Sequence, residues 1–506
     1  MQARRFIGLA VLAVWLGVVG WHVRREYYET ASVRMAAGAR TLAPGTHWYI
    51  IRMDGVPIGI AQSRLDTVPD GFLFQDETTL DIPALGRVQR ARALTRLELD
   101  AQLDIRTFRF QLESEIGSFA VRGTVEADST VALVMDAGGG PQESRMKASE
   151  QLLLDASLLL RMAASGELRV GNEFAARVFD PSSMAERALQ VRVTERSTIV
   201  VADSARFVDG RWQATLLDTV PVFRVEQKFG GVSLANWVDE DGQIVRAESP
   251  LGFTIERTYY ELARQEWRSG AAAGELAAGY GALIEGTAIS SNVDLDAVPE
   301  RAQLAVRLGG VELRGFDLEG GRQRLHGDTL LITRESLAGA TYALPYRGGG
   351  AAADELAATP LIQSEDARIV AAARRAARGS SDAAEVARRL NDWVYGALRK
   401  DVTLSVPSAL QVLEAQRGDC NEHTVLYVAL ARALGLPART AVGLVHVRGS
   451  FYYHAWPEVW LGEWFAVDPT LGQYPADASH VRFLVGGLVR QVELIRLIGR
   501  LQLEVL

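Results

Sequence analysis

The segment Gly418-Asp419-Cys420-Asn421-Glu422-His423-Thr424 holds the only cysteine of this 506-residue chain. Downstream come His454-Ala455-Trp456 and then Asp468-Pro469-Thr470. A thiol, an imidazole and a carboxylate in this chain order are the parts of a cysteine nucleophile, its general base and the acid that orients the base. The three segments therefore predict thiol chemistry carried by Cys420, His454 and Asp468.

The residues around Cys420 predict a turn followed by a helix. Gly418 and Asp419 favour the turn, and apolar residues between 425 and 434 continue a helix that ends at Gly435. Cys420 would then begin the helix, where free N–H groups and the helix dipole favour a thiolate and can receive an oxyanion. A lone cysteine is more often a small buried apolar residue, but the polar neighbours of Cys420 argue against that interpretation.

His454 and Asp468 are predicted to share one face of a β-hairpin. Opposed residues in an antiparallel pair have numbers with a constant sum, so these two even-numbered residues share a face when that sum is even. A three-residue loop at 461–463 gives this result and pairs Trp460 with Trp464. A two-residue loop puts them on opposite faces unless a bulge intervenes, for which Pro457 is a plausible position. On the shared face, Asp468 would hold the tautomer of His454.

Two further histidines, His423 and His446, follow the cysteine and are candidate ligands of a metal ion. His423 follows Cys420 by three residues, and we interpret it as a core or supporting histidine rather than as the base. Together with His446 and His454, these residues would suggest zinc, but a second Cys/His pair at short spacing is missing. The sequence therefore predicts no metal and no cofactor.

Three tryptophans fall close together in the hairpin, at Trp456, Trp460 and Trp464. One interpretation is packing inside the hairpin. The other is an aromatic wall for an extended substrate, which makes all three candidate substrate-binding residues.

Residues before the cysteine domain show the period-two pattern of strands. From about Thr46 to Leu262 apolar and polar residues alternate, as in residues 108–113, and Asp-Gly pairs punctuate the runs at 54–55, 70–71, 209–210 and 241–242. This pattern predicts an antiparallel β domain at residues 46–268, a curved sheet or half-barrel with one helix at 149–165. A linker precedes a small β subdomain of about four strands at residues 283–345. Helical periodicity begins near Thr359.

Composition and the N-terminus limit the class of protein. The net charge of −8 argues against a nucleic-acid partner, and the 48% hydrophobic content is that of a globular protein. Residues 6–23 carry no formal charge and are flanked by arginines. They predict a single transmembrane anchor, although a cleaved signal peptide is the alternative. We expect the protein in the inner (cytoplasmic) membrane with its soluble body on the periplasmic side.

Residues 355–506 resemble the transglutaminase-like superfamily of papain-related thiol enzymes, in particular its bacterial and archaeal branch. The matching pieces are Gly418-Asp419-Cys420, the exit 433–439, His454-Ala455-Trp456, Asp468-Pro469-Thr470 and a final strand within 495–506. The resemblance implies a Cys420–His454–Asp468 triad and an acyl-thioester formed from a glutamine side chain or a peptide bond. Either an amine or water would then take the acyl group.

The sequence thus predicts a membrane-anchored α+β chain with N-terminal β domains and a C-terminal transglutaminase-like domain. Two functions are compatible with this organisation. The first is an envelope-anchored acyltransferase, deamidase or cysteine peptidase acting on a protein or peptide, with cell-wall peptide among the candidates. The second is a non-catalytic binding or assembly protein, whose β domains recruit an envelope partner beside a vestigial thiol domain.

Overall fold

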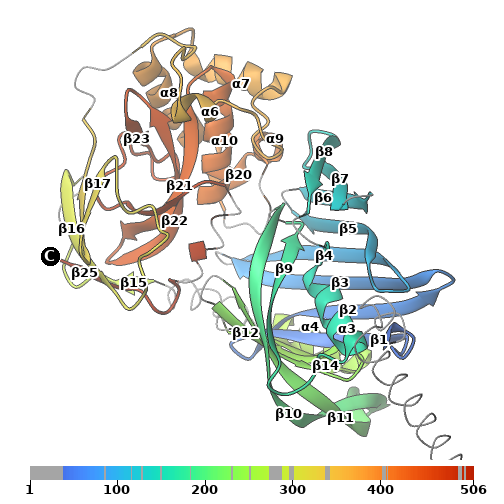
Figure 1. Cartoon of the computed structure of the whole chain (residues 1–506). Helices are drawn as coiled ribbons and strands as arrows, with labels where there is room; N and C mark the ends of the chain where they lie inside the picture. The colour runs from blue at the N-terminus through green and yellow to red at the C-terminus, as the bar shows by residue number, and fades with distance from the viewer. Residues whose placement is uncertain are drawn as a thin grey trace, which may run out of the picture.

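The computed structural model describes residues 38–506 except 85–86, 116, 127–128, 149–150, 183, 230–231, 250–251, 273–287, 296–300, 337–341, 402–405, 407, 488–489, 491–492 and 495–496. The predicted membrane anchor at residues 6–23 lies outside the described residues. Within the described part of the chain, every helix is too short or too polar to cross a membrane. The fold is mostly β with some helices and is of the α+β class, and Figure 1 shows a large curved sheet beside a mixed α/β body.

One antiparallel sheet of 14 strands occupies residues 45–258. Strands β1 to β8 pair in chain order, as do strands β9 to β14, and β1 also pairs with β14, so β8 and β9 are the two edge strands. Its strands are β1 Gly45–Met53, β2 Val56–Val68, β3 Gly71–Ala84, β4 Arg87–Asp100, β5 Ile105–Ser114, β6 Ser118–Val125, β7 Thr130–Asp136, β8 Gln142–Lys147, β9 Glu173–Asp180, β10 Ala185–Val208, β11 Arg211–Phe229, β12 Val232–Val238, β13 Ile244–Glu248 and β14 Phe253–Thr258.

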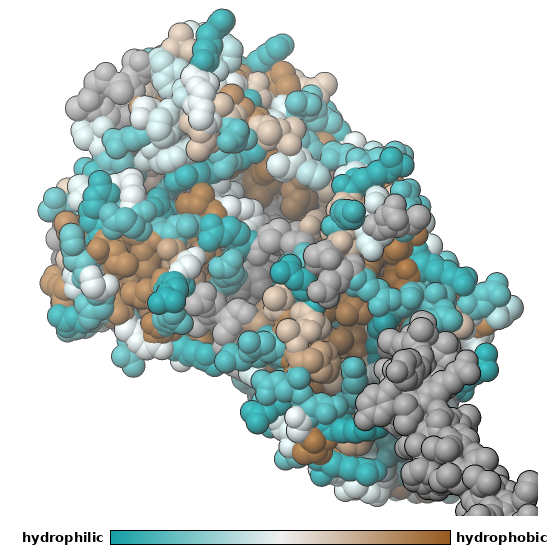
Figure 2. All heavy atoms as spheres, in the orientation of Figure 1, coloured by the Kyte–Doolittle hydropathy of each residue, from teal (hydrophilic) through white to brown (hydrophobic). Residues whose placement is uncertain are grey.

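The helix α3 (Asp155–Ser165) fills the curve of this sheet. Leu160 and Ala164 pack against apolar residues of β2 to β7, while Leu158 and Met162 pack against β9 to β12. Both halves of the sheet therefore bury their inner faces on one helix. Figure 2 shows hydrophilic side chains over most of the visible face and hydrophobic side chains gathered near α3. A second helix, α4 (Tyr260–Ala272), packs against β1 and β2.

The Asp-Gly pairs lie at the predicted turns. Asp54-Gly55 joins β1 to β2 and Asp209-Gly210 joins β10 to β11, both as two-residue loops with positive φ at each position. This conformation matches the twist of paired strands and favours Asn or Asp followed by Gly. At the third pair, the loop between β2 and β3 is Pro69-Asp70, and Gly71 begins the next strand.

The C-terminal body packs a layer of helices on a sheet. Helix α10 is central, because it contacts α7, α8 and α9 on one side and β21 and β22 on the other. The helices are α6 Ala351–Asp354, α7 Ala367–Ala377, α8 Ala383–Ala397, α9 Ala409–Ala415 and α10 Cys420–Ala433. The sheet has the order β15-β22-β21-β24, with β23 on β22, and is made of β15 Ile289–Ser290, β21 Ala438–Val447, β22 Ser450–Trp460, β23 Trp464–Ala466 and β24 Val481–Val485. The two-residue strands β19 Arg399–Lys400 and β20 Arg417–Gly418 pair in parallel before α10.

The small β subdomain differs from its prediction in how it is completed. Its sheet has the order β17-β18-β16-β25, where β16 is Gln303–Gly309, β17 is Gln323–His326, β18 is Thr329–Thr333 and β25 is Gln502–Val505. The last strand of the chain therefore joins this sheet, not the sheet of the cysteine domain as the resemblance implied. Val306 and Ile332 share one core with Val442, Phe451 and Phe483 of the cysteine domain. Because this core is shared, the strand gains apolar burial there that pairing elsewhere would not supply.

Helix α9, just before the cysteine helix, is held by the rim of the large sheet. The Gln411 amide donates to the Ser118 carbonyl, and the Ser408 hydroxyl donates to the Ala137 carbonyl. Gly138 has a φ of +87°, and a Cβ there would lie 2.6 Å from the Gln411 side chain, so only glycine fits without displacement. The β domain is thus fastened close to the start of α10.

Candidate active site

Cys420 is the first residue of α10, as the sequence predicted. Asp419 caps the helix by accepting from the Asn421 N–H at 2.9 Å, and the Glu422 carboxylate accepts from the Asp419 N–H at 3.0 Å. This reciprocal arrangement is a capping box. At Gly418, a Cβ would lie 2.2 Å from the Glu422 Cβ, so glycine is required for the buried Glu422 to reach back. The local sequence therefore fixes where the thiol stands.

The surroundings of the thiol overturn the expectation of a resting thiolate. Cys420 is only partly exposed, and burial raises the pKa of its thiol well above the ordinary value; the charge of Asp419 raises it further, while a hydrogen bond from the Ala455 backbone N–H lowers it. A helix terminus contributes about 0.3–1 kcal/mol, less than one pKa unit, whereas burial can shift a pKa by as much as 3–5 units. Burial and the Asp419 charge therefore favour the neutral thiol over the thiolate.

We expect the Asp419→Asn variant to make Cys420 more reactive at lower pH. Asparagine still caps a helix, but the substitution removes the negative charge that raises the thiol pKa. In the wild type, the rate of alkylation by iodoacetamide should rise with pH to a midpoint above about 8.5, the ordinary thiol value. In the variant this midpoint should move down, while Asp392→Asn on the exposed side of α8 should leave it unchanged. A wild-type midpoint below pH 7 would contradict the neutral resting thiol.

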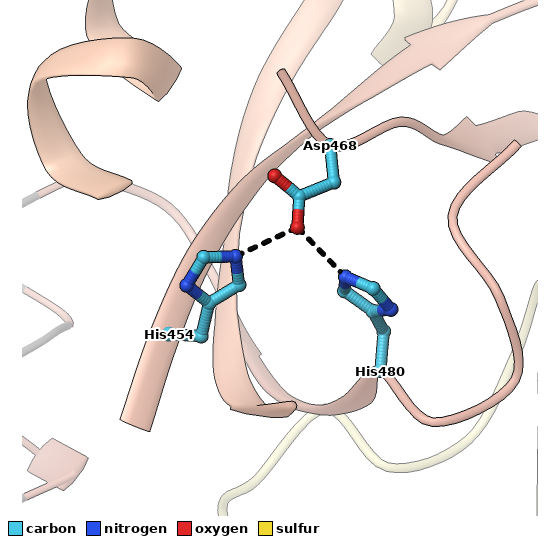
Figure 3. A group of neighbouring side chains, drawn as sticks. All are labelled: His454, Asp468 and His480. Atoms are coloured by element: carbon cyan, nitrogen blue, oxygen red, sulfur yellow. Dashed lines mark hydrogen bonds and ion pairs between the residues drawn. The ribbon is translucent and has the colours of Figure 1, made fainter. Parts of the chain in front are cut away.

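His454 and Asp468 lie on a shared face, as predicted from the register. Trp460 pairs with Trp464 across the 461–463 loop, and the His454 Nε2 lies 2.8 Å from the Asp468 Oδ2. The His454 side chain is 8% exposed and that of Asp468 is 0% exposed. Figure 3 shows the other ring nitrogen of His454, Nδ1, pointing away from Asp468. That nitrogen is the one available to a neighbouring thiol.

His480 is part of the site and was missed by the sequence analysis. It stands just before β24, and its Nε2 lies 3.0 Å from the same Asp468 Oδ2 that meets His454 (Figure 3). Its Nδ1 lies 3.2 Å from the Asp477 Oδ1. The side chain is completely buried. No motif marks this histidine; only the loop between Asp468 and β24 brings it to the carboxylate.

The hydrogen bonds determine the protonation of this chain of groups. Burial by itself raises the pKa of Asp468, but the charges and hydrogen bonds of His454 and His480 reverse this and hold it well below the ordinary value. Burial also raises the pKa of Asp477, but the hydrogen bond and charge of His480 outweigh burial and lower this pKa to about 2. Carboxylates only accept, so both nitrogens of His480 must donate. His480 is therefore an imidazolium, and its pKa is raised because these two carboxylates outweigh burial.

Asp468 is satisfied on both oxygens. Its Oδ2 accepts from the two imidazoles, and its Oδ1 accepts from the backbone N–H groups of Thr470 at 2.7 Å and Leu471 at 3.0 Å. A neutral His454 therefore carries its proton on Nε2 and a lone pair on Nδ1. This is the tautomer that can accept a proton from a thiol.

The same three residues lie close enough together to hold a metal ion. One ligand atom each from His454, Asp468 and His480 lies within 4.8 Å of the others. The His480 imidazolium offers no lone pair, however, and a metal would have to displace its proton from between two carboxylates. The donor set therefore fits a hydrogen-bonded chain better than a metal site.

The predicted tryptophan wall is corrected at one position. Trp456 is completely buried and its ring lies 6.1 Å from the His454 ring in a stacked arrangement, so it packs inside the domain and offers no exposed surface to an aromatic wall. Trp460 and Trp464 are partly exposed and contact each other edge to face at 5.4 Å. Substrate binding by these two stays a prediction.

His423 is a core residue, in agreement with its interpretation. It is completely buried, and its Nδ1 donates to the Asp419 carbonyl at 2.7 Å, one turn back in α10. Burial lowers the pKa of its ring. This neutral histidine supports the start of the helix.

The small sheet supports the loop that carries His480. Arg322, which is buried, donates from Nη2 to the carbonyl groups of Ala476 at 2.9 Å and Asp477 at 2.7 Å. Arg482, two residues beyond His480, donates to the Glu458 carboxylate at 3.1 Å and to the Gly320 carbonyl at 3.0 Å. The orientation of Asp477 and His480 therefore depends on residues more than 100 positions earlier in the chain.

Residues 370–469 match the family model of the transglutaminase-like superfamily, a range that includes Cys420, His454 and Asp468 and ends before His480. No curated protein matches the chain. Several solved structures are similar, among them the following three. A candidate cysteine protease from Cytophaga hutchinsonii has 15% identity, covering 40% of this chain and 83% of that one, with a TM-score of 0.28. A β-barrel-like protein with a domain of unknown function from Brucella abortus has 13% identity, 43% and 94% coverage and a TM-score of 0.31. The periplasmic domain of TgpA from Pseudomonas aeruginosa has 15% identity, 37% and 83% coverage and a TM-score of 0.24.

The family match identifies the C-terminal part of this protein as a transglutaminase-like domain, and so as a relative of the thiol enzymes.

Proposed function

We propose that this protein is a thiol enzyme that transfers or hydrolyses the acyl groups of peptide or protein amides, with Cys420, His454 and Asp468 as its triad. The observation that carries the proposal is the hydrogen bond of 2.8 Å between His454 Nε2 and Asp468 Oδ2, which leaves Nδ1 as the base. The Cys420 sulfur lies against the strand that carries His454, because it accepts a hydrogen bond from the backbone N–H of the next residue, Ala455.

In the proposed reaction, His454 first accepts a proton from Cys420 and later returns it to the leaving group. His454 Nδ1 takes the thiol proton as the Cys420 sulfur attacks the amide carbonyl. The capping box uses the N–H groups of Asn421 and Glu422, so the Cys420 N–H is the helix-start donor left for the oxyanion. The C–N bond then breaks, His454 returns the proton to the leaving ammonia or amine, and a thioester remains. Water or a second amine attacks the thioester, and Cys420 recovers its proton.

The setting we propose is the bacterial envelope. Residues 6–23 would anchor the chain in the inner membrane as a single span, with the soluble body on the periplasmic side. The 14-stranded sheet would bring an envelope partner or peptide substrate to the thiol domain, since its rim already holds α9 beside the start of α10.

The test is formation of a covalent intermediate on the single cysteine. The full chain is incubated with a library of glutamine-containing peptides, with and without a fluorescent primary amine, and its mass is measured. We expect the wild type to gain an acyl adduct at Cys420, with release of ammonia or of a cleaved amine, and Cys420→Ala to gain none. Products labelled with the amine would indicate transfer, and unlabelled products would indicate hydrolysis.

The alternative of a non-catalytic binding protein gives a different result. In that case no adduct forms, and the wild type and Cys420→Ala retain the same peptides or protein partners with equal affinity. The thermal unfolding midpoint of Cys420→Ala provides the control for folding.

A further inference from the structure

Two neighbouring half-open cavities, called lobes below, lie along α3 on the inside of the curved sheet. One lobe has a volume of about 130 Å³ and the other of about 330 Å³. Asp76 of β3, Ala156 and Leu159 of α3, and Ile244 of β13 line both lobes, so the two spaces are adjacent. The larger lobe is within the range of roughly 300–1,000 Å³ that is typical of small-molecule sites. Cys420 and His454 line neither lobe.

Each lobe contains a buried amide whose nitrogen has no hydrogen-bond partner among the described residues. Gln243 lines the smaller lobe and is 5% exposed, and Gln227 lines the larger lobe and is 6% exposed. Their oxygens are engaged, because the Ser63 hydroxyl donates to Gln243 Oε1 at 3.5 Å and the Asn236 amide donates to Gln227 Oε1 at 3.1 Å. Each Nε2 is therefore presented as a free donor.

The carboxyl group of Asp76, which lines both lobes, adds an acceptor. Its Oδ1 is buried and has no hydrogen-bond partner among the described residues, while the carboxyl group shares the Ser63 hydroxyl with Gln243. Leaving a buried polar atom unpaired costs about 1–3 kcal/mol, and more for a charged group. One unpaired acceptor and two unpaired donors facing these lobes are therefore a costly arrangement unless a bound molecule satisfies them.

Apolar side chains form much of the remaining lining, beside Asp155, Asp180 and Thr95 in the larger lobe and Gln62 and Thr78 in the smaller one. Phe74, Ile255 and Leu159 line the smaller lobe. Phe110, Phe179 and Leu234 line the larger lobe. A ligand that fits must bury apolar surface in both lobes while it offers an N–H group or ammonium to the carboxylate and carbonyl oxygens to the amides.

We propose that the two lobes together bind an apolar amino acid or a short apolar peptide, with its ammonium or amide N–H on Asp76 Oδ1 and its carbonyl or carboxylate oxygens on the Nε2 groups of Gln227 and Gln243. The proposal does not depend on the reaction at Cys420.

The test is calorimetric titration of the full-length Cys420→Ala protein, which cannot form a thioester, with the dipeptide Leu-Leu. Titrations at pH 8 keep Asp76 ionised, because burial raises its pKa to about 7. We expect saturable one-to-one binding that weakens at least tenfold in Asp76→Asn and in Gln243→Leu, since the first change removes the charge that faces the ligand ammonium and the second removes a hydrogen-bond donor. Asp218→Asn, an exposed aspartate of β11, should bind as tightly as the parent.

Two further measurements make the result decisive. Melting temperatures show whether each variant is folded, and Leu-Leu should raise that of the parent but not that of Asp76→Asn. Heptylamine and dodecanoate are titrated in parallel, because they carry only the cation or only the anion beside an apolar chain. Both should bind more weakly than Leu-Leu. Absence of Leu-Leu binding, equal binding by Asp76→Asn, or tighter binding of dodecanoate than of Leu-Leu would each overturn the proposal.

Discussion

The Asp468→Asn variant is expected to lose about 10³–10⁴-fold in the rate at which Cys420 forms an acyl-enzyme, the scale seen when a triad carboxylate becomes an amide. Asp468 accepts four hydrogen bonds, two on each oxygen. An asparagine amide must place its NH₂ group against either the two imidazole donors or the two backbone donors. The N–H groups of the amide would then face other N–H groups. His454 would be forced into the tautomer that carries its proton on Nδ1.

The measurement is single-turnover acylation by a peptide substrate, followed by mass spectrometry of the single cysteine. The conservative control is Asp392→Asn on α8, which removes an exposed carboxylate of the same size and should leave the rate unchanged. A loss of less than tenfold in a folded Asp468→Asn protein would show that the Asp468 hydrogen bond does not position the base.

The His480→Phe variant is expected to lose about 3–5 kcal/mol in the free energy of unfolding near pH 6, the usual cost of removing one partner from a buried charge pair. Phenylalanine keeps a ring in the site but removes both N–H donors. Asp468 and Asp477 would then face each other without the cation between them. The loss should be accompanied by slower acylation, because one oxygen of Asp468 no longer has its second partner.

The pH dependence of the destabilisation in His480→Phe distinguishes a lost charge interaction from a packing defect. The pKa of His480 is raised in the folded state, so its stabilisation is complete below the unfolded value of 6.5 and declines as the pH rises through the folded pKa. The pKa of Asp477 is lowered to about 2, so its contribution is present above the unfolded value of 3.8 and is lost as the pH falls towards 2. The difference between wild type and variant should therefore be largest between about pH 4 and pH 6.5.

Urea unfolding across pH 3–9 measures this difference. His326→Phe, at an exposed histidine of β17, is the matched control and should leave stability nearly unchanged at every pH. A destabilisation of His480→Phe that stays constant with pH would indicate a packing defect and would contradict the buried imidazolium.

Features that depend on neighbouring residues were predictable from the sequence. Asp419 and Glu422 cap a helix within one turn, so Cys420 could be placed at its start. The turn at Asp54-Gly55 and the 461–463 loop set the register of their hairpins, and the second of these placed His454 on the same face as Asp468. Parity of residue numbers was sufficient there, because side chains alternate strictly along a strand.

Features that depend on distant contacts were not predictable. The C-terminal strand β25 joins β16, about 200 residues earlier in the chain, because apolar residues there share the core of the cysteine domain. Trp456 looked like its exposed neighbours in the sequence, yet it is completely buried. The helix start favoured a thiolate, but burial and Asp419 outweigh that effect.

The sequence by itself placed Cys420 at the start of its helix and brought His454 and Asp468 to one face, because capping, turns and strand alternation act over a few residues. Only the tertiary structure decided that His480 completes the chain of charges, that burial favours the neutral thiol, and that the curved sheet encloses polar groups without partners. Those properties follow from burial and from hydrogen bonds between residues far apart in the chain, and both are consequences of packing.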